Sequence, residues 1–270
     1  MRVTGLFVYP LKSARGVPLD EAPLDGFGVA GDRRWSLLGP DDRVITQRDC
    51  PILATLDAVP TEDGIELRAP DLQTLRVTRP TQDAGRLSIE IWKDRTEGAA
   101  AGPEVDSWLE AFLARPCRLS YMPNSTRRQV SLQYGRPGDH VSFADGFPLL
   151  LTSDASLAEL NGRLGMDVPM DRFRPNLVVD GTEPFAEDDW ARIRVADTSF
   201  RVVKPCARCV VTTVDQRTGK KGREPLQMLA TFRNSGGKVL FGQNLIHDGP
   251  GPIRVGDEVE VLERRITPAG

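Results

Sequence analysis

The first hundred residues alternate between short apolar runs and polar turn sequences. Gly39-Pro40-Asp41-Asp42 and Glu62-Asp63-Gly64 are typical of hairpin turns. Short runs with partial period-two alternation predict β-strands. We expect these strands at residues 3–9, 34–38, 43–46, 53–59, 65–68, 75–78 and 87–92. The pattern indicates a small antiparallel barrel or sandwich.

The apolar period changes near residues 104–114. Val105, Trp108, Leu109 and Phe112 recur every three or four residues, as on one face of a helix. Pro116 follows, as is common after a helix end. The helix therefore closes the first unit. A strand at 117–122 and a polar, basic loop at 123–138 come next.

The second half combines strands with two short helices. Thr152-Ser153-Asp154 is an N-cap sequence and predicts a helix directly after a strand. We expect strands at 147–151, 177–179, 193–195, 200–203, 210–214, 239–246 and 258–262, and a second helix at 226–233. The predicted fold is mainly β (α+β). It has two β-barrel-like domains, residues 1–120 and 121–270, and a few short helices.

Composition and charge narrow the possible functions. The chain has 270 residues, a net charge of -3 and a sequence pI near 5.6, which does not favour a nucleic-acid-binding surface. Four cysteines are too few for a disulfide framework and indicate a reducing compartment. The sequence contains neither a signal peptide nor an apolar run of the ~20 residues that span a bilayer. We expect a soluble, cytoplasmic protein without a membrane partner.

The most informative stretch is Lys204-Pro205-Cys206-Ala207-Arg208-Cys209, followed by a β-branched run. Lys204 and Arg208 are expected to favour the thiolate form of the cysteines, which binds soft metals. Zinc fits poorly, because Cys50 and Cys117 stand alone and only two histidines are available. A redox dithiol and an inert buried thiol pair remain open, beside ligation of a metal or cofactor.

Cations also recur at predicted strand ends. Lys12 and Ser13 follow the first strand, Arg33 precedes the second, and Arg174 and Asn176 precede another. Such groups suit an anionic ligand, and the free N–H groups of a capped helix after residue 152 would add to them. Each group alone is equally well explained as surface charge or as a simple cap. Asp215 could deliver protons or cap the Arg217-Thr218-Gly219 turn, and we favour the turn.

Six ordered motifs resemble the MOSC proteins with an N-terminal β-barrel domain. These motifs are residues 9–13, 31–35, 173–176, 205–215, 240–244 and 255–257. The family includes relatives of the mitochondrial amidoxime-reducing component and of the C-terminal domain of molybdenum cofactor sulfurase. The resemblance extends over nearly the whole chain.

The resemblance implies a molybdopterin-type molybdenum cofactor in a cleft between the two domains. The second cysteine of the motif, Cys209, would be the metal ligand at the floor of this cleft, with Cys206 as a neighbour. The cofactor-binding positions would be Lys12, Ser13, Arg33, Thr152, Ser153, Arg172, Arg174, Asn176 and Arg208. Cys209 and Asp215 are the candidate catalytic residues. Pyridoxal phosphate binding is associated with the family only in general.

The implied activity is reduction of small N-hydroxylated substrates such as amidoximes, hydroxylamines or N-hydroxylated bases. The cofactor would supply the redox chemistry as molybdenum cycles between Mo(VI) and Mo(IV). The sequence contains no iron–sulfur extension, so electrons would come from a separate ferredoxin, flavodoxin or reductase. The alternative is a non-catalytic carrier that transfers the cofactor or its sulfurated form. The sequence also contains no aminotransferase-like domain, so we do not expect sulfurase activity from this chain alone.

Overall fold

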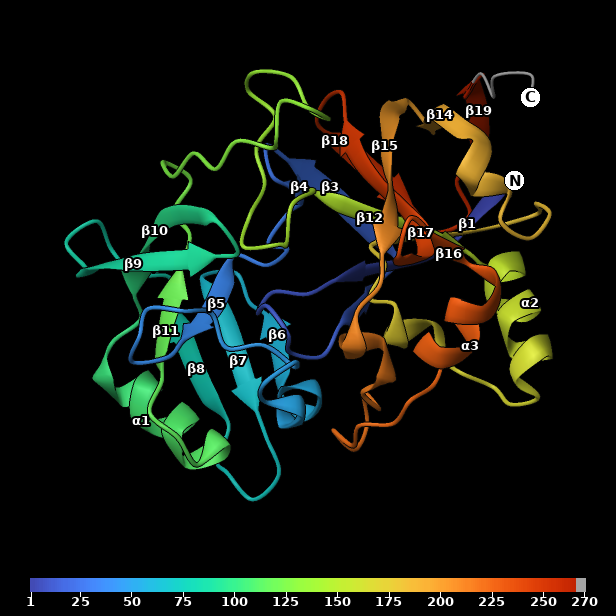
Figure 1. The fold of residues 1–270 in the computed structure, drawn as a ribbon. Coiled ribbons are helices and arrows are strands. Elements are labelled where there is room, and N and C mark those ends of the chain that lie inside the picture. The colour runs from blue at the N-terminus through green and yellow to red at the C-terminus, as the bar shows by residue number, and fades with distance from the viewer. Residues whose placement is uncertain (266–270) are drawn as a thin grey trace.

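The computed structural model describes residues 1–265 (Figure 1). Over these residues the chain is mainly β, which confirms the predicted fold class. The described residues form three α-helices, α1 (Pro103–Leu113), α2 (Asp154–Leu164) and α3 (Leu226–Phe232). None of the helices within residues 1–265 is long and apolar enough to cross a membrane.

The first half contains two small antiparallel sheets. One has the order β5-β11-β10-β9 and the other β6-β7-β8. Their strands are β5 (Trp35–Leu38), β6 (Asp57–Pro60), β7 (Gly64–Arg68), β8 (Leu75–Thr78), β9 (Arg86–Ile91), β10 (Asp94–Ala100) and β11 (Arg118–Tyr121). Leu37, Leu67 and Leu119 from these strands pack with Leu109 of α1 in one core. The helix therefore closes this unit, as predicted.

The second half is built on a large sheet with the order β19-β14-β15-β17-β12-β13-β1-β2. Its strands are β1 (Arg2–Val8), β2 (Val17–Leu19), β12 (Leu149–Ser153), β13 (Leu177–Asp180), β14 (Trp190–Val195), β15 (Thr198–Ala207), β17 (Lys238–His247) and β19 (Val259–Arg264), and β16 (Asn234–Ser235) pairs with β17. β1 and β2 thus lie in a sheet made mostly by the second half. The boundary at 120/121 remains a prediction.

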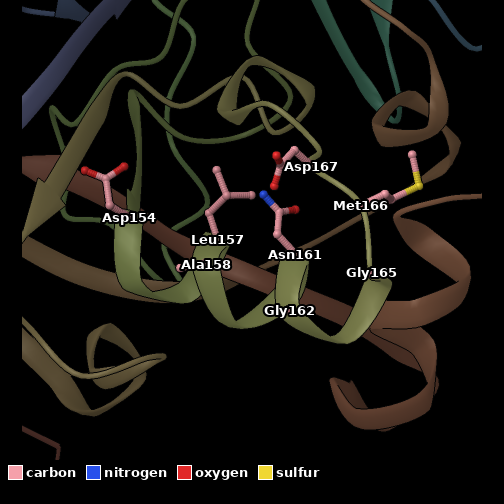
Figure 2. Close-up of a pocket in the computed structure, with 8 residues that line it drawn as sticks. All are labelled: Asp154, Leu157, Ala158, Asn161, Gly162, Gly165, Met166 and Asp167. Atoms are coloured by element: carbon pink, nitrogen blue, oxygen red, sulfur yellow. The ribbon is translucent and has the colours of Figure 1, made fainter.

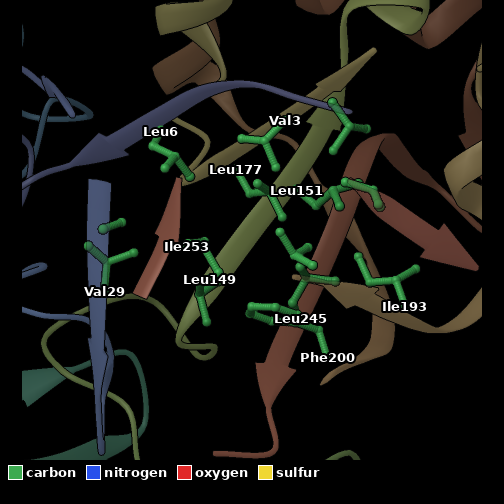
Figure 3. Close-up of a cluster of buried hydrophobic side chains, with 14 of the residues drawn as sticks. Val3, Leu6, Val29, Leu149, Leu151, Leu177, Ile193, Phe200, Leu245 and Ile253 are labelled. Atoms are coloured by element: carbon green, nitrogen blue, oxygen red, sulfur yellow. The ribbon is translucent and has the colours of Figure 1, made fainter. Parts of the chain in front are cut away.

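A third small sheet lies against the main one. It contains β3 (Glu21–Asp25), β4 (Gly28–Val29) and β18 (Gly251–Arg254). Figure 3 shows the apolar core that joins them, in which Val29 and Ile253 of the small sheet meet Leu6, Leu151 and Leu245 of the large sheet. The first thirty residues are therefore fixed to the second half by hydrophobic burial as well as by strand pairing.

Helices α2 and α3 cover one side of the large sheet (Figure 1). Ser153 is the N-cap of α2, because its hydroxyl accepts a hydrogen bond from the backbone N–H of Ser156 at 3.1 Å. Leu160 of α2 and Leu229 of α3 pack with Phe173 and Phe241. The predicted cap and both predicted helices of this half are confirmed.

Two predicted strands in the first half are wrong in whole or in part. Residues 43–46 form only isolated bridges, Leu38 with Val44 and Arg43 with Glu90. Residues 53–59 begin inside the 3-10 helix η1 (Pro51–Thr55), and only the end of the range is extended, in β6. Pro51 explains the helix start, because its fixed φ suits the first helical turn.

The predicted strand at 210–214 is also wrong. Its β-branched residues form the 3-10 helix η4 (Val210–Thr213). The hydroxyls of Thr212 and Thr213 donate to the carbonyl oxygens of Cys209 and Val210, at 3.0 and 2.8 Å. Threonine side chains here satisfy local carbonyl groups that a strand would present to a neighbour. The remaining 3-10 helices are η2 (Met170–Arg172) and η3 (Ala186–Asp189).

Candidate cofactor site

The two motif cysteines lie where β15 leaves the large sheet. Pairing of β15 with β17 ends at Ala207 opposite Leu240, after an irregularity between Pro205 and Ala207. Cys206 belongs to the end of the strand, and Cys209 immediately precedes η4. Both thiols are free and partly exposed. The end of pairing thus frees the chain to present the Cys209 side chain outside the sheet.

The expected effect of the flanking cations on the cysteines is only partly correct. Lys204 Nζ lies 4.5 Å from the centroid of the Tyr134 ring and 5.8 Å from that of Phe147, so this cation faces aromatic rings. Burial raises the pKa of Cys206, although the Arg208 guanidinium opposes this effect. Arg208 thus acts on Cys206 in the predicted direction, but burial outweighs it.

Arg48 is the cation beside Cys209. Burial opposes it, but the charges of Asp145 and of the neighbouring Cys209 raise the pKa of the Arg48 guanidinium. Its Nη2 also donates to Oδ2 of Asp145 at 2.9 Å, and Oδ1 of Asp145 accepts from Nζ of Lys12 at 2.5 Å. Burial raises the pKa of Asp145, but Lys12 and Arg48 outweigh it and hold that pKa well below its usual range. Lys12, Asp145 and Arg48 thus form a chain of ion pairs that ends close to Cys209.

Lys12 is almost fully buried, at 7% exposure, and burial lowers the pKa of its ammonium group. Besides Asp145, it donates to the carbonyl oxygen of Phe143 at 2.7 Å. An ammonium carries three donors. Two of them are thus used by the protein itself, so Lys12 has limited capacity for a ligand in this arrangement.

Arg33 and Arg174 meet at the ring of Tyr9. Their Cζ atoms lie 4.2 and 4.3 Å from the ring centroid, a cation–π geometry. The Tyr9 hydroxyl donates to the carbonyl oxygen of Pro175 at 3.0 Å. Burial lowers the pKa of Arg174 to about 10. Gly16 lies against the same ring, and a Cβ there would come within 2.5 Å of it, so only glycine fits without a shift.

Asp32 and Asn176 hold Arg33 in place. Nη1 of Arg33 donates to Oδ2 of Asp32 at 2.6 Å and to Oδ1 of Asn176 at 3.0 Å. Nδ2 of Asn176 donates to Oδ1 of Asp32 at 3.1 Å and to the Phe7 carbonyl oxygen at 3.2 Å. Asp32 and Asn176 are each only 1% exposed. Asn176 therefore acts within the protein as a connector between the first strands and β13.

A pair of glutamines links the two halves next to this group. Gln47 and Gln216 exchange side-chain hydrogen bonds of 3.0 and 3.1 Å. Nε2 of Gln47 also donates to the carbonyl oxygen of Ser13 at 2.8 Å, and Nη1 of Arg174 lies 3.5 Å from Oε1 of Gln216. Ser13 has a φ of +69°, a conformation rare for a non-glycine residue. The backbone of Ser13 is thus held by the contact between the halves.

Arg172 and Asp215 are direct partners. Nη2 of Arg172 donates to Oδ2 of Asp215 at 3.2 Å. The other carboxylate oxygen of Asp215 accepts from the backbone N–H groups of Arg217 and Thr218, at 3.1 and 2.9 Å. The favoured interpretation of Asp215 as the cap of this turn is confirmed. Asp215 also orients Arg172.

Arg208 contacts the backbone beside α2 and α3. Its Nε and Nη1 donate to the carbonyl oxygens of Phe241 and Phe173, at 2.8 and 2.9 Å. Gly242, with a φ of +75°, keeps space beside it, because a Cβ there would lie 2.9 Å from Cγ2 of Thr152 and 3.5 Å from Nη2 of Arg208. The side chains of Thr152 and Arg208 therefore both lie next to Gly242.

Ser153 does not lie in this group. Its hydroxyl contacts Oγ of Ser156 at 2.7 Å and Oε2 of Glu187 at 3.1 Å, beneath α2. Successive side chains of a strand point to opposite faces. Thr152 and Ser153, neighbours at the end of β12, accordingly face different surroundings. Ser153 is therefore separate from the contacts described above for the other predicted positions.

Three buried guanidinium nitrogens within the described residues have no hydrogen-bond partner in this cluster: Arg48 Nε, Arg172 Nε and Arg208 Nη2. Orphaned buried donors are uncommon and indicate a missing acceptor. The cluster contains six cations, Lys12, Arg33, Arg48, Arg172, Arg174 and Arg208, three carboxylates in contact with them, Asp32, Asp145 and Asp215, and a further carboxylate nearby, Asp171. Unsatisfied donors, excess positive charge and a partly exposed thiol fit an anionic, thiolate-ligated cofactor.

Two hollows of the described surface lie elsewhere. One, of about 540 Å³, follows α2 from Asp154 to Asp167 (Figure 2), and the other, of about 280 Å³, is lined by His140 and His247. Neither includes Cys209. Within residues 1–265, no group of three or more histidine, cysteine or acidic side chains is arranged as a metal cage. The cofactor cleft between the domains therefore stays a prediction.

The sequence motifs missed four residues of the site: Arg48, Asp145, Gln47 and Gln216. Gln47 and Arg48 lie between the two predicted strands at 43–46 and 53–59, in a stretch that no motif marks. Gln216 follows Asp215 directly, but a neutral amide in a turn carries no chemical signal by itself. Folding alone brings these side chains to Cys209 and Ser13, so their role becomes visible only from contacts distant in sequence.

Comparison with known proteins agrees with these motifs. The MOSC domain profile matches residues 138–260, and the MOSC N-terminal beta barrel domain profile matches residues 1–116. The chain is 33% identical to "Mitochondrial amidoxime-reducing component 1" of Homo sapiens over 279 residues, covering 96% of this chain and 82% of the relative. The corresponding protein of Xenopus laevis is 32% identical, with 97% and 82% covered.

A second group of relatives is named for the cofactor. The chain is 30% identical over 271 residues to "Molybdenum cofactor sulfurase" of Oryza sativa, covering 90% of this chain and 32% of that protein. The match to this larger protein therefore involves about a third of it. Through such members the family is associated with the molybdenum cofactor. The chain belongs to the MOSC family and includes the family's N-terminal β-barrel domain.

Proposed function

We propose that this protein binds the molybdenum cofactor through Cys209 and reduces N-hydroxylated compounds. The observation that supports this most directly is the setting of Cys209, a partly exposed thiol beside Arg48, in a cluster with three unpartnered buried guanidinium nitrogens. Relatives named amidoxime-reducing components, at 30–33% identity over most of the chain, support the reaction class.

The residues divide into three proposed roles. Cys209 supplies the thiolate ligand, and Arg48 positions it. Arg172 and Arg208 hold the anionic part of the cofactor, because each keeps an unsatisfied N–H after its contacts to the protein. A guanidinium binds phosphate well, since its planar donors match two oxygens at once. Thr152 packs its methyl group near Arg208, whereas its hydroxyl donates to Sδ of Met170 at 3.2 Å, so we assign Thr152 to shaping this side of the site.

The remaining predicted positions act as supports. Lys12 fixes Asp145 and thereby Arg48, while Arg33 and Arg174 pack on Tyr9. Asp215 orients Arg172 and closes its own turn, and its carboxylate is occupied by these contacts. We therefore assign Asp215 to positioning of Arg172. Residues that hold ligand-binding groups in this way commonly matter 10- to 100-fold for affinity or activity.

The proposed reaction breaks one N–O bond. An amidoxime takes up two electrons and two protons and yields an amidine and water. The cofactor, when bound, supplies the two-electron couple. The chain contributes binding and orientation: the cationic cluster holds the anion, and the exposed side of Cys209 leaves room for a small substrate. Electrons are proposed to come from a separate protein, a ferredoxin, a flavodoxin or a reductase.

Turnover separates this proposal from the carrier alternative. Protein loaded with molybdenum cofactor would be mixed with reduced methyl viologen and benzamidoxime. We expect viologen oxidation in step with benzamidine formation, two viologens for each product. Transfer of the cofactor to an acceptor apoenzyme without any benzamidine would contradict the reductase proposal and favour a carrier.

A further inference from the structure

An unusual hairpin lies beside the site. Strands β9 and β10 are joined by the two-residue turn Trp92-Lys93, since Ile91 pairs with Asp94. Trp92 has a φ of +58°, in the left-handed region. Two-residue hairpin turns favour Asn or Gly at such positions, and a bulky residue there is a conformational outlier. The backbone conformation at position 92 therefore favours asparagine or glycine over the tryptophan that is present.

The turn is fixed against the second half by an ion pair. Oδ2 of Asp94 accepts from Nη2 and Nε of Arg128, at 2.8 and 3.2 Å. Nη1 of Arg128 also donates to the carbonyl oxygens of Ser142 and Ala144, at 2.8 and 2.5 Å. Arg128 is buried, with 5% exposure. The hairpin tip is thus tied to the segment that contains Asp145, and Figure 1 shows β9 directed towards the second half.

Trp92 contacts the cation that positions Cys209. Cζ of Arg48 lies 4.7 Å from the centroid of the Trp92 ring. The same guanidinium donates to Asp145 and lies close enough to Cys209 for that group to raise its pKa. Yet Trp92 remains 63% exposed, the highest exposure, shared with Leu132, among the large apolar side chains of residues 1–265. A large aromatic surface therefore stays open to solvent one guanidinium away from the candidate metal ligand.

Strain that persists at a functional site is a reason to look for a role of the strained residue. The hairpin between β14 and β15 offers a comparison within the chain. It also has a two-residue turn, Ala196-Asp197, and Ala196 has a φ of +48°. That turn carries a small side chain and lies away from Cys209. A tryptophan is thus not required to close a hairpin of this type.

We propose that Trp92, supported by Arg48, forms an aromatic-binding subsite at the rim of the Cys209 site. The class of ligand it takes is the planar, conjugated N-hydroxylated compound: aryl amidoximes and N-hydroxylated purine or pyrimidine bases. The planar faces of such molecules stack on an indole ring, whereas hydroxylamine has no planar conjugated system that could stack. This inference rests on the proposed function and defines which substrates of that class are preferred.

Three variants test the subsite. Trp92→Gly removes the ring and suits the left-handed φ, so the hairpin is retained without it. Trp92→Phe keeps an aromatic face. Ala196→Gly makes the same backbone change at the matched hairpin and serves as the control. The turnover of benzamidoxime and of hydroxylamine would be measured with the holoprotein of each variant. Benzamidoxime binding would be measured separately, by calorimetry in every variant and also by quenching of tryptophan emission in the wild type.

For Trp92→Gly we expect the KM and the dissociation constant of benzamidoxime to rise about three- to tenfold, the range expected for one aromatic stacking contact. The kcat for benzamidoxime and the KM for hydroxylamine should stay within about twofold of the wild type. Trp92→Phe should recover most of the affinity, and Ala196→Gly should change neither constant.

Equal losses for both substrates would overturn the proposal, because they would mean that Trp92 only holds Arg48. Unchanged benzamidoxime binding in Trp92→Gly would overturn it as well. If the wild-type holoprotein reduces neither substrate, the proposed function fails. The calorimetric comparison of benzamidoxime binding then still decides on the subsite by itself.

Discussion

The barrel core of the first half and the cation cluster around Cys209 each contain two cysteines, but the burial and the charged neighbours of these cysteines differ between the two regions. Cys50 and Cys117 pack among leucines, and burial raises the pKa of both thiols, that of Cys117 to about 12. Cys206 and Cys209 lie at a strand end, partly exposed, with Arg208 and Arg48 nearby. The comparison shows that surroundings, more than residue type, separate a packing thiol from a candidate ligand.

The same contrast extends to the forces that hold each region. The barrel core is apolar, and its stability follows from buried area. The cluster is polar, and Asp32, Asn176 and Gln216 inside it are almost completely buried and hydrogen-bonded. Buried polar groups contribute when every partner is present and cost free energy when one is removed. Substitutions in the two regions should therefore fail in different ways.

The largest effect is expected at the ligand. Cys209→Ser should lower benzamidoxime turnover by more than about a hundredfold, since even outer-shell partners of a metal cost 10- to 100-fold. Cys206→Ser should retain most activity. The midpoint of urea unfolding should be nearly unchanged in both variants, because neither thiol is part of an apolar core. Equal loss of activity in the two would instead favour dithiol chemistry.

The next largest effect concerns the buried ion pair. Asp32→Ala removes the acceptor of Arg33, Tyr9 N–H and Asn176. Leaving a buried cation without its partner typically costs about 3–5 kcal/mol of the free energy of unfolding. Urea unfolding measures this directly. Exchange of an exposed partner, as in Glu260→Ala opposite Arg194, is the control and should cost below about 1 kcal/mol.

Arg48→Lys should affect function more than stability. It keeps the positive charge but cannot hold Asp145, Cys209 and the Trp92 ring with one planar group. We expect turnover or cofactor retention to fall about 10- to 100-fold. Arg68→Lys, in a surface pair of the barrel, is the matched control. Full activity of Arg48→Lys would show that charge alone suffices beside Cys209.

The smallest effect should follow substitution of a barrel cysteine. Cys117→Ala leaves a small space in the core and should lower the free energy of unfolding by about 1 kcal/mol. Molybdenum content and turnover should match the wild type. A loss of molybdenum in this variant would mean that the barrel thiols are not separate from the site.

Local chemistry made much of the fold predictable. The cap at Ser153, the period of α1 and the turn at Asp215 each follow from side chains close in sequence. The β-branched run at 210–213 misled, because threonine hydroxyls bond to the preceding turn as readily as threonines fill a strand. The pairing of β1 with β13 could not be inferred, since no local pattern identifies a partner strand more than 170 residues away.

The candidate site was predictable only where a motif carried it. Cys209, Arg33 and Arg174 stand in motifs, whereas Arg48 and Trp92 do not. Alternation along β12 could have separated Thr152 from Ser153 in advance. That the Lys12 ammonium group is used for hydrogen bonds within the protein could not be predicted, because its partners Asp145 and Phe143 lie more than a hundred residues away. Which cations remain available to a ligand depends on such distant contacts.

The most direct test of the central claim is the molybdenum and pterin content of the purified protein, compared between wild type and Cys209→Ser. Both would be prepared from a host that makes the cofactor. We predict about one molybdenum and one pterin per chain in the wild type and little molybdenum in the variant, with both proteins folded. Equal molybdenum in the two proteins, or neither molybdenum nor pterin in the wild type, would contradict the assignment of Cys209 as the cofactor ligand.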